Sequence, residues 1–471
     1  MKNGDELTLE IERSAFEGKC VARVDGLVVF VPGVVPGDTV RVKLRKVKSQ
    51  YAEAEPIEVT RNSNLRADPR CKYFGVCGGC KWQHVDYAAQ LTFKRQQVID
   101  ALERIGGFQD MHVNETLGSE EVYFYRNKME FSFGEQWLAD KEFADLKAAG
   151  GKGAAALGLH PAARFDKVLD IDECWLQSTL SNRILNAVRR LILENRLTIY
   201  STRTHIGYLR NLVIREGRRT GEVMVNLVTS EDRKEVMAPL SQSLVGEIPE
   251  ITTVVNNVTT RKSQVAVGEY ERVYHGPGTI TDRIGGLSFS ISANSFFQTN
   301  TGQAEKLYEV AKRMAKLEQE DVVYDLYSGT GTIALFLADQ VSKVVGIEMV
   351  ESAVLDARRN AELNGVTNCW FEIGDLKEKL TKDREWLQRH GPPTVLIIDP
   401  PRSGLHEKAI NAMLQLRPRR MVYVSCNPTT QARDLKLLCA NGGYAIEEVQ
   451  PVDMFPHTYH IENVVGLRRN G

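Results

Sequence analysis

The chain has 471 residues, enough for about three structural units at about 150 residues each. Its 60 Lys and Arg residues stand against 61 Asp and Glu residues, so the net charge of −1 gives no support for a uniformly basic protein. Residues 1–6 carry no apolar signal-type segment, and no apolar run approaches the length of about 18 residues that a membrane span needs. We therefore expect a cytoplasmic protein that has no membrane partner.

The N-terminal residues 1–62 show short β-type runs separated by glycine and proline, the pattern of a small barrel. Arg41, Lys43 and Arg45 alternate along one run and would share one face of a strand. Lys46 and Lys48 add to this charge. Two interpretations stay open from the residues alone: a solvated edge strand protected by charge, or a phosphate-binding surface on an oligonucleotide-binding type of barrel.

The middle of the chain, residues 63–285, begins with a cysteine-rich stretch and a helix predicted from about 86 to 104, followed by mixed strands and helices. Cysteines of a reducing compartment are not expected to form disulfides, so a cluster of them indicates metal binding or catalysis. Cys71, Cys77 and Cys80 lie within ten residues, and Cys174 stands far downstream. Four thiolates can hold either Zn²⁺ or an iron–sulfur cluster, although the wide first gap makes a compact zinc ribbon less natural.

Residues 286–471 alternate short apolar runs with helical patterns, which predicts a doubly wound, mostly parallel sheet. The run 322–326 leads into Tyr327 and then into Gly329 and Gly331, a turn that lets a ligand approach the backbone. An ordinary strand-to-helix turn is the alternative. Glu348 ends the next strand, where it can accept hydrogen bonds from ribose, and Asp375 ends the third, within reach of an adenine edge.

Three further residues suggest the reaction. Asp399 precedes two prolines at the ligand-binding edge of the sheet, although a plain turn would also explain it. Cys426 follows a strand at the same edge, where it is either a nucleophile or a small buried residue. Glu462 lies in an otherwise apolar strand, either as a base or pointing to solvent. A thiolate, a carboxylate and an adenosyl crevice together indicate addition to C6 of a pyrimidine, alkylation of C5 and removal of the C5 proton.

Four motifs in chain order resemble those of the uracil-5 RNA methyltransferases, and the resemblance covers essentially the whole chain. They are Tyr327 with 329–331, Asp399-Pro400-Pro401-Arg402, Ser425-Cys426-Asn427-Pro428, and Phe455-Pro456-His457-Thr458 followed by His460-Ile461-Glu462. The resemblance implies S-adenosylmethionine as methyl donor, Cys426 as nucleophile and Glu462 as base. It also implies that Gln298, Tyr327, Glu348 and Asp399 contact the cofactor, and that Phe296 stacks on a flipped base unless it is a core aromatic.

The same resemblance extends to the other two regions. The N-terminal barrel resembles the TRAM module of the ribosomal-RNA branch, so Arg41, Lys43 and Arg45 are expected to contact RNA. The four cysteines resemble the ligands of a 4Fe–4S cluster. Their spacing differs from the Cys-x3-Cys-x2-Cys motif of radical enzymes, so we expect the cluster to order the middle region and present RNA.

The sequence therefore predicts a multidomain α/β protein with a TRAM barrel at 1–62, an iron–sulfur domain at 63–285 and a Rossmann-like methyltransferase domain at 286–471. The expected activity is methylation of a uridine C5 in RNA, most of all 23S rRNA, by a monomer. Three alternatives are a transfer-RNA uracil methyltransferase, a catalytically silent RNA-binding or assembly factor, and an enzyme that methylates amino groups. The last leaves Cys426 and Glu462 without a role.

Overall fold

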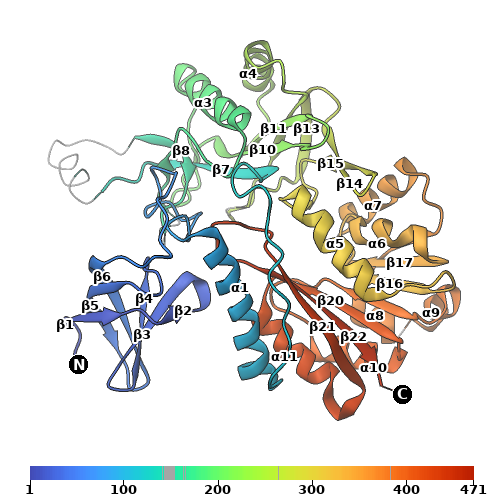
Figure 1. Ribbon diagram of the computed structural model, residues 1–471. Helices are drawn as coiled ribbons and strands as arrows, with labels where there is room; N and C mark the ends of the chain where they lie inside the picture. The colour runs from blue at the N-terminus through green and yellow to red at the C-terminus, as the bar shows by residue number, and fades with distance from the viewer. Residues whose placement is uncertain are drawn as a thin grey trace. The chain divides into compact units, whose positions relative to one another are not determined.

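The computed structural model describes residues 1–139, 142, 154–162, 164, 166–263, 265–381 and 383–470 (Figure 1). The chain forms two compact units. Unit 1 comprises Met1–Gly75, Cys80–Glu120 and Pro400–Gly471, and unit 2 comprises Val76–Gly79 and Glu121–Asp399. Unit 1 thus contains both the beginning and the end of the chain, and the three-domain division made from the sequence stays a prediction.

The N-terminal part of unit 1 is a six-stranded sheet in the order β1-β5-β6-β4-β3-β2. Its pairs are antiparallel except for the parallel pair of β4 and β6. Its apolar core includes Val40, Val42 and Leu44 on β5. This confirms the small β module expected at the N-terminus. The strands are β1 (Glu6–Glu10), β2 (Arg13–Ser14), β3 (Lys19–Val24), β4 (Leu27–Pro32), β5 (Thr39–Val47) and β6 (Tyr51–Arg61).

The basic strand of this sheet is β5, and the predicted alternation holds because every second residue from Val40 to Leu44 is buried. β5 lies between β1 and β6, so the interpretation as a charged edge strand is wrong. Several of its cations pair with glutamates on β6: Arg41 with Glu58 at 3.2 Å, Arg45 with Glu55 at 2.5 Å and Lys46 with Glu53 at 3.2 Å.

The cysteine-rich stretch of unit 1 leads into helix α1 (Tyr87–Ala101), which continues as the π-helical turn η2 (Leu102–Gly106). The Asp86 carboxylate caps the helix start by accepting the N–H groups of Ala88 and Ala89, and Gly107 ends it at a φ of +77°. The helix predicted from about 86 to 104 is thereby confirmed. Both α1 and η2 pack against α11 (Pro428–Leu438) near the other end of the chain (Figure 1).

The C-terminal part of unit 1 contains three neighbouring strands in the order β20-β22-β21, and both pairs are antiparallel. Helices α10 and α11 flank β20 in the sequence. The 3-10 turn η4 (Ala440–Gly442) leads from α11 to β21. The remaining bounds are α10 (Glu407–Leu416), β20 (Arg420–Ser425), β21 (Tyr444–Val452) and β22 (Glu462–Arg469).

The first half of unit 2 is a seven-stranded sheet in the order β13-β12-β11-β10-β7-β8-β9. Its central strands β10, β11 and β12 are buried almost throughout. Helix α3 (Thr179–Glu194) contacts α4 (Lys234–Glu247). The strands are β7 (Lys128–Glu135), β8 (Ala155–Leu159), β9 (Leu169–Asp170), β10 (Leu209–Glu216), β11 (Val223–Thr229), β12 (Thr253–Val258) and β13 (Tyr270–His275).

The second half of unit 2 begins with a hairpin of β14 and β15. The parallel strands in the order β18-β17-β16-β19 follow it in the chain. The chain winds outward from β16 to β17 and β18, then returns to place β19 on the other side of β16. Such a reversal of strand order creates a crevice at the carboxyl ends of the strands. The bounds are β14 (Thr279–Ile284), β15 (Leu287–Ser292), α5 (Thr301–Ala315), β16 (Val322–Leu326), α6 (Thr332–Leu337), η3 (Ala338–Gln340), β17 (Lys343–Glu348), α7 (Glu351–Leu363), β18 (Cys369–Ile373), α8 (Leu376–Thr381), α9 (Arg384–His390) and β19 (Val395–Ile398).

These strands coincide with the apolar runs from which a parallel sheet was predicted, and the α/β class is confirmed. Within the described parts of the chain, none of the helices combines the length and the apolar character needed to cross a membrane.

Candidate functional site

The crevice of unit 2 opens where β16 turns into α6. Tyr327, Gly329 and Gly331 all have positive φ angles, of +67°, +54° and +77°. A tyrosine in this conformation is strained and must be held by its surroundings. Its N–H group donates to the Ile347 carbonyl on the neighbouring strand at 3.0 Å. The sequence therefore folds into a tight turn that exposes backbone at the edge of the sheet.

Glu348 at the end of β17 is bonded to this turn. One of its carboxylate oxygens accepts the Gly329 N–H at 3.0 Å, and the other accepts those of Met349 and Val350 at 2.7 and 2.9 Å. A carboxylate has about four acceptor positions, so capacity is left for a further hydroxyl. The Gly374 N–H donates to the Glu348 carbonyl at 2.9 Å and brings the end of β18 to the same edge.

Asp375 follows at this edge and is exposed. Its carboxylate accepts the Glu378 N–H at 3.2 Å, so it caps the start of α8. The predicted cofactor residues Tyr327, Gly329, Glu348 and Asp375 therefore lie at one edge of the sheet.

Two acidic residues, Asp325 and Asp399, lie on β16 and directly after the adjacent strand β19. Asp399 directly follows β19, and its N–H donates to the Leu326 carbonyl at 3.3 Å. Burial raises the pKa of Asp399 to about 7. Burial also raises the pKa of Asp325 well above its ordinary value, and the nearby charge of Asp399 raises it further. One Asp325 oxygen accepts the Ala334 N–H at 3.0 Å.

The sequence reasoning missed Asp325. The available signal was an acidic residue inside the otherwise apolar strand 322–326, the same signal that drew attention to Glu462.

The segment 293–300 between β15 and α5 carries Phe296 and Gln298. Phe296 is 65% exposed, so the interpretation as a core aromatic is wrong, and Phe297 takes the buried position. The Gln298 carbonyl accepts the Asn127 side-chain amide at 2.8 Å. The Phe296 carbonyl accepts the Thr330 hydroxyl at 3.3 Å, which joins this segment to the glycine turn.

The same segment is also held from β10. The buried guanidinium of Arg215 donates to the carbonyls of Ala293 at 3.2 Å and Ser295 at 2.5 Å. Neither Asn127 nor Arg215 stands in a motif, so sequence reasoning gave no reason to select them.

Unit 1 brings the two predicted reacting residues together. β20 and β22 are antiparallel, and their last pair joins Ser425 to Asn463. Beyond this last pair, the next residue on the β20 side is Cys426 and the next on the β22 side is Glu462, so the two residues stand at neighbouring strand ends. Glu462 is only 6% exposed, so the interpretation that it points to solvent is wrong.

Two buried amides fix these strand ends. The Gln431 side-chain amide donates to the carbonyls of Tyr423 and Asn463 at 2.9 and 3.1 Å, and its oxygen accepts the Asn463 amide at 2.7 Å. Cys426 itself lies just before helix α11, whose first turn is capped by the Asn427 side chain.

The four cysteines predicted to bind metal are divided between the units: Cys71 and Cys80 belong to unit 1, and Cys77 and Cys174 to unit 2. No disulfide joins any of the eight cysteines, all of which are described. The sulfur of Cys80 accepts the Gln83 amide at 3.2 Å, and that of Cys77 accepts the Gly79 N–H at 3.4 Å. Such hydrogen bonds suit thiolates that ligate metal.

Among the described residues, no three or more His, Cys, Asp or Glu side chains are grouped so that they could hold a metal ion. The four-cysteine site therefore stays a prediction.

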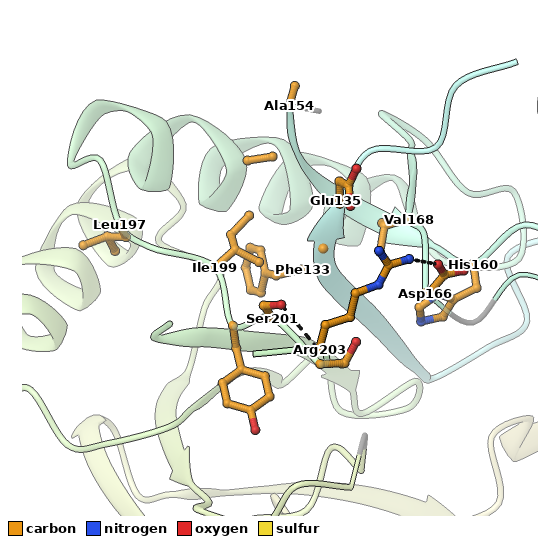
Figure 2. Close-up of a pocket in the computed structure, with 14 residues that line it drawn as sticks. Phe133, Glu135, Ala154, His160, Asp166, Val168, Leu197, Ile199, Ser201 and Arg203 are labelled. Atoms are coloured by element: carbon orange, nitrogen blue, oxygen red, sulfur yellow. Dashed lines mark hydrogen bonds and ion pairs between the residues drawn. The ribbon is translucent and has the colours of Figure 1, made fainter. Parts of the chain in front are cut away.

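A separate pocket of about 350 Å³ lies in unit 2 beside β7 and β8. Figure 2 shows Arg203 reaching toward Asp166, with which it pairs at 2.7 Å. The ring nitrogens of His160 in its wall contact the Lys167 carbonyl at 2.7 Å and the Ser132 hydroxyl at 3.0 Å. None of the residues singled out from the sequence lines this pocket.

Substitution of the two glycines in the turn should have different effects on stability and on cofactor binding. A Cβ at Gly331 would lie 2.7 Å from Phe371 and 3.0 Å from Ala357, whereas one at Gly329 meets no atom within 4 Å. We expect Gly331→Ala to lower the free energy of unfolding by about 2–4 kcal/mol through overpacking and the positive φ. Gly329→Ala should cost about 1 kcal/mol but weaken S-adenosylmethionine binding, because it fills the crevice. Denaturant unfolding and calorimetric titration measure both effects, and equal losses of stability would contradict the assignment.

The raised pKa of Asp399 predicts that the free energy of unfolding depends on pH. Its pKa in the folded protein, about 7, is above the unfolded value of 3.8, so the folded state binds more protons between these values. The wild type should therefore lose stability as the pH rises from about 4 to 7. We expect Asp399→Asn to raise the melting temperature at pH 8 by roughly 2–4 °C, the shift typical of about 1 kcal/mol, and to change it little at pH 4. A melting temperature unchanged at pH 8 would contradict the buried charge.

Comparison with known proteins agrees with this architecture. Residues 278–470 match the family model described as tRNA (Uracil-5-)-methyltransferase, and residues 1–57 match the TRAM domain. An uncharacterized RNA methyltransferase of Chlorobaculum tepidum is 47% identical over 99% of this chain and 97% of its own length. One of Bacteroides thetaiotaomicron is 44% identical over 96% of this chain and 99% of its own.

One solved structure is similar over the full length. The crystal structure of Pyrococcus abyssi tRNA (uracil-54, C5)-methyltransferase in complex with S-adenosyl-L-homocysteine superposes with a TM-score of 0.75 at 30% identity. The match covers 98% of this chain and all of that one. From the TRAM module to the paired ends of β20 and β22, this chain belongs to the family of uracil-5 RNA methyltransferases.

Proposed function

We propose that this protein methylates C5 of a uridine in RNA, using S-adenosylmethionine as the methyl donor. The observation that supports the proposal is the register of β20 and β22, whose last pair, Ser425 with Asn463, is followed at the two strand ends by Cys426 and Glu462. A nucleophile and a base on adjacent strands can act on C6 and C5 of one pyrimidine ring, because these atoms are bonded neighbours.

Cys426 is the proposed nucleophile. Its thiolate forms a bond to C6 of the uridine, and the electron pair of the 5,6 double bond moves to C5 and the adjoining carbonyl. C5 then takes the methyl group, and the donor leaves as S-adenosylhomocysteine. The position of Cys426 just before α11 favours the thiolate, since a helix N-terminus stabilises negative charge.

Glu462 is the proposed base. Its carboxylate removes the proton from C5, the electron pair restores the 5,6 double bond, and the bond between C6 and the Cys426 sulfur breaks. The product is 5-methyluridine and the free thiolate. Because Glu462 is buried at a strand end, little water competes for its proton-accepting oxygens.

The crevice of unit 2 fits the proposed cofactor. S-adenosylmethionine, when bound, supplies an electrophilic methyl group. Glu348 has acceptor capacity for ribose, Asp375 is exposed toward solvent at the same edge, and Gly329 leaves open space for a ligand. We propose that Gln298, Tyr327, Gly331 and Asp399 complete the binding residues.

RNA binding is proposed for two surfaces. Exposed Phe296 offers a ring on which a base can stack. Arg41, Lys43 and Arg45 lie along β5, and the ion pairs of Arg41 and Arg45 with glutamates are exposed and worth up to about 1 kcal/mol each. Phosphates can displace such weak pairs, so we propose that this strand contacts the RNA backbone.

Two RNA classes compete as substrates. We propose 23S rRNA, acted on by a cytoplasmic monomer; the support is the TRAM module at residues 1–57, which the resemblance described above associates with the ribosomal-RNA branch. A transfer RNA is the second candidate. It is favoured by the full-length similarity to a tRNA methyltransferase from Pyrococcus abyssi, whose match extends over the TRAM region of this chain.

Methylation maps test both the reaction and the substrate. We expect cells that lack the gene to lose 5-methyluridine from 23S rRNA, and a plasmid with the wild-type gene to restore it. Cys426→Ala should restore nothing, and Glu462→Gln should trap protein bound covalently to RNA, because proton removal normally precedes release. Loss of the mark from tRNA instead supports the second candidate. Full activity of Cys426→Ala, or a methyl group on an exocyclic amine, would exclude this mechanism.

We also propose that Cys71, Cys77, Cys80 and Cys174 bind a 4Fe–4S cluster. The support is the donor set of four thiols and the hydrogen bonds that reach two of the sulfurs. The reaction above transfers no electrons through the protein. The proposed role of the cluster is therefore to order the segment around Cys80.

Spectroscopy distinguishes the two metals. Protein purified without oxygen should be brown and contain about four iron atoms per chain, and oxidation should bleach its visible absorbance. Cys80→Ala should lower the iron content, while Cys439→Ala, the control, should keep it. A colourless protein that holds stoichiometric zinc would overturn the assignment.

A further inference from the structure

The connection between β21 and β22 ends directly at the proposed base. The two strands pair until Val452 faces Glu462, and residues 453–461 close the hairpin. Asp453 is therefore the first residue after the partner of Glu462. Any group that fixes Asp453 and the following turn also fixes the strand end on which Glu462 stands.

Asp453 is held by a fully buried ion pair. Its carboxylate accepts the Lys94 ammonium at 2.5 Å, the Tyr87 hydroxyl at 3.0 Å and the Phe455 N–H at 3.0 Å. Both charged side chains are 0% exposed. The Lys94 ammonium also donates to the Phe455 carbonyl at 3.1 Å, so it spans the start of the turn. Burial lowers the pKa of Lys94, and the Asp453 charge opposes this shift.

A second contact holds the middle of the turn. His457 has a φ of +64°, a strained backbone for this residue type. The Gln90 side-chain oxygen accepts the His457 N–H at 2.9 Å, and the N–H groups of Lys81 and Trp82 donate to its carbonyl at 2.9 and 3.0 Å. The Gln90 amide in turn donates to the Trp82 and Val85 carbonyls.

Tyr87, Gln90 and Lys94 are spaced three and four residues apart on α1, so they share one face of the helix. Three polar residues on one face of α1 therefore all form hydrogen bonds with the segment 453–457. Stability does not require this arrangement, because well-packed apolar residues often replace a buried ion pair without loss. A buried pair does, however, fix the geometry of the atoms it joins.

We propose that Tyr87, Gln90 and Lys94 are positioning residues that hold the hairpin 453–461 so that Glu462 can reach the C5 proton. This inference rests on the proposed methyl transfer. Cys426 directly follows β20 and does not belong to the hairpin. The inference therefore predicts different effects on the two steps of that reaction. Loosening the hairpin should therefore slow proton removal while leaving the addition of the Cys426 sulfur to C6 almost unchanged.

The test uses the full-length protein, RNA with tritium at C5 of uridine, and S-adenosylmethionine with a labelled methyl group. Lys94→Met should form the methylated covalent complex at a rate within about threefold of wild type. Its release of tritium should be slower by about 10- to 100-fold, part of the roughly 10²–10⁴-fold that a general base contributes. The denaturation-resistant complex should accumulate, as for Glu462→Gln.

A paired variant separates positioning from folding. Lys94→Met combined with Asp453→Leu leaves no buried charge unpaired, so its melting temperature should be higher than that of Lys94→Met alone, while tritium release stays slow. Gln90→Met loosens the turn without removing a charge and should give the same pattern more weakly. The matched control is Arg95→Met on the same helix, whose guanidinium bonds the Val113 carbonyl, and it should release tritium at the wild-type rate.

The outcomes distinguish this inference from the proposed function. If the wild type neither methylates RNA nor forms a covalent complex, the proposed function fails. If the wild type and Glu462→Gln behave as expected but Lys94→Met, the double variant and Gln90→Met slow both steps equally or neither step, the positioning role alone is wrong.

Discussion

The antiparallel register of β20 and β22 is the constraint on which the proposed chemistry of unit 1 depends. Because side chains alternate faces along a strand, a slip of one residue would turn either Cys426 or Glu462 away from the other. Near the site, the buried Gln431 amide donates to a backbone carbonyl on each strand, and the Asn463 side chain donates to the Gln431 oxygen. Leaving a buried donor without an acceptor is costly, so these hydrogen bonds favour the observed register.

The acidic residues inside this molecule have two different environments. Asp453 faces a lysine and two other donors, and the pair defines a single arrangement of the hairpin. Burial raises the pKa values of Asp325 and Asp399, and the charge of Asp399 raises that of Asp325 further. An arrangement that costs stability at neutral pH is typical of a functional site, because ligand groups can later compensate the charge. The Asp453 ion pair fixes the conformation of the hairpin, whereas the charge at Asp325 and Asp399 can be compensated by a bound ligand.

The sequence predicted the features that arise from local patterns. Alternation identified the buried and exposed faces of β5, and glycines with an acidic strand end identified the crevice around Glu348. Helix α1 was predicted from its apolar spacing and its glycine stop. The role of that helix was not predicted, since Lys94 and Asp453 are separated by 359 positions and neither stands out in its own segment.

The solvent exposure of individual side chains was the second feature that the sequence could not predict. Phe296 and Phe297 are adjacent and identical in type, and only the packed chain shows that the first is exposed and the second buried. Glu462 posed the same problem, because alternation in a strand permits either face. In both cases a sequence pattern gave two interpretations, and the burial of one side chain decided between them.

Residues 80–82, which follow the other cysteines of the segment, and the hairpin 453–461 both belong to unit 1 and contact one another there, which offers a structural role for the proposed metal cluster. Cys80 is followed immediately by Lys81 and Trp82, whose N–H groups both donate to the His457 carbonyl. A metal bound by Cys80 would restrict these two donors before any RNA arrives, and so lower the entropy lost in ordering the hairpin. Because the proposed reaction moves a methyl group and a proton but no electrons through the protein, such ordering accounts for the cysteines without redox chemistry.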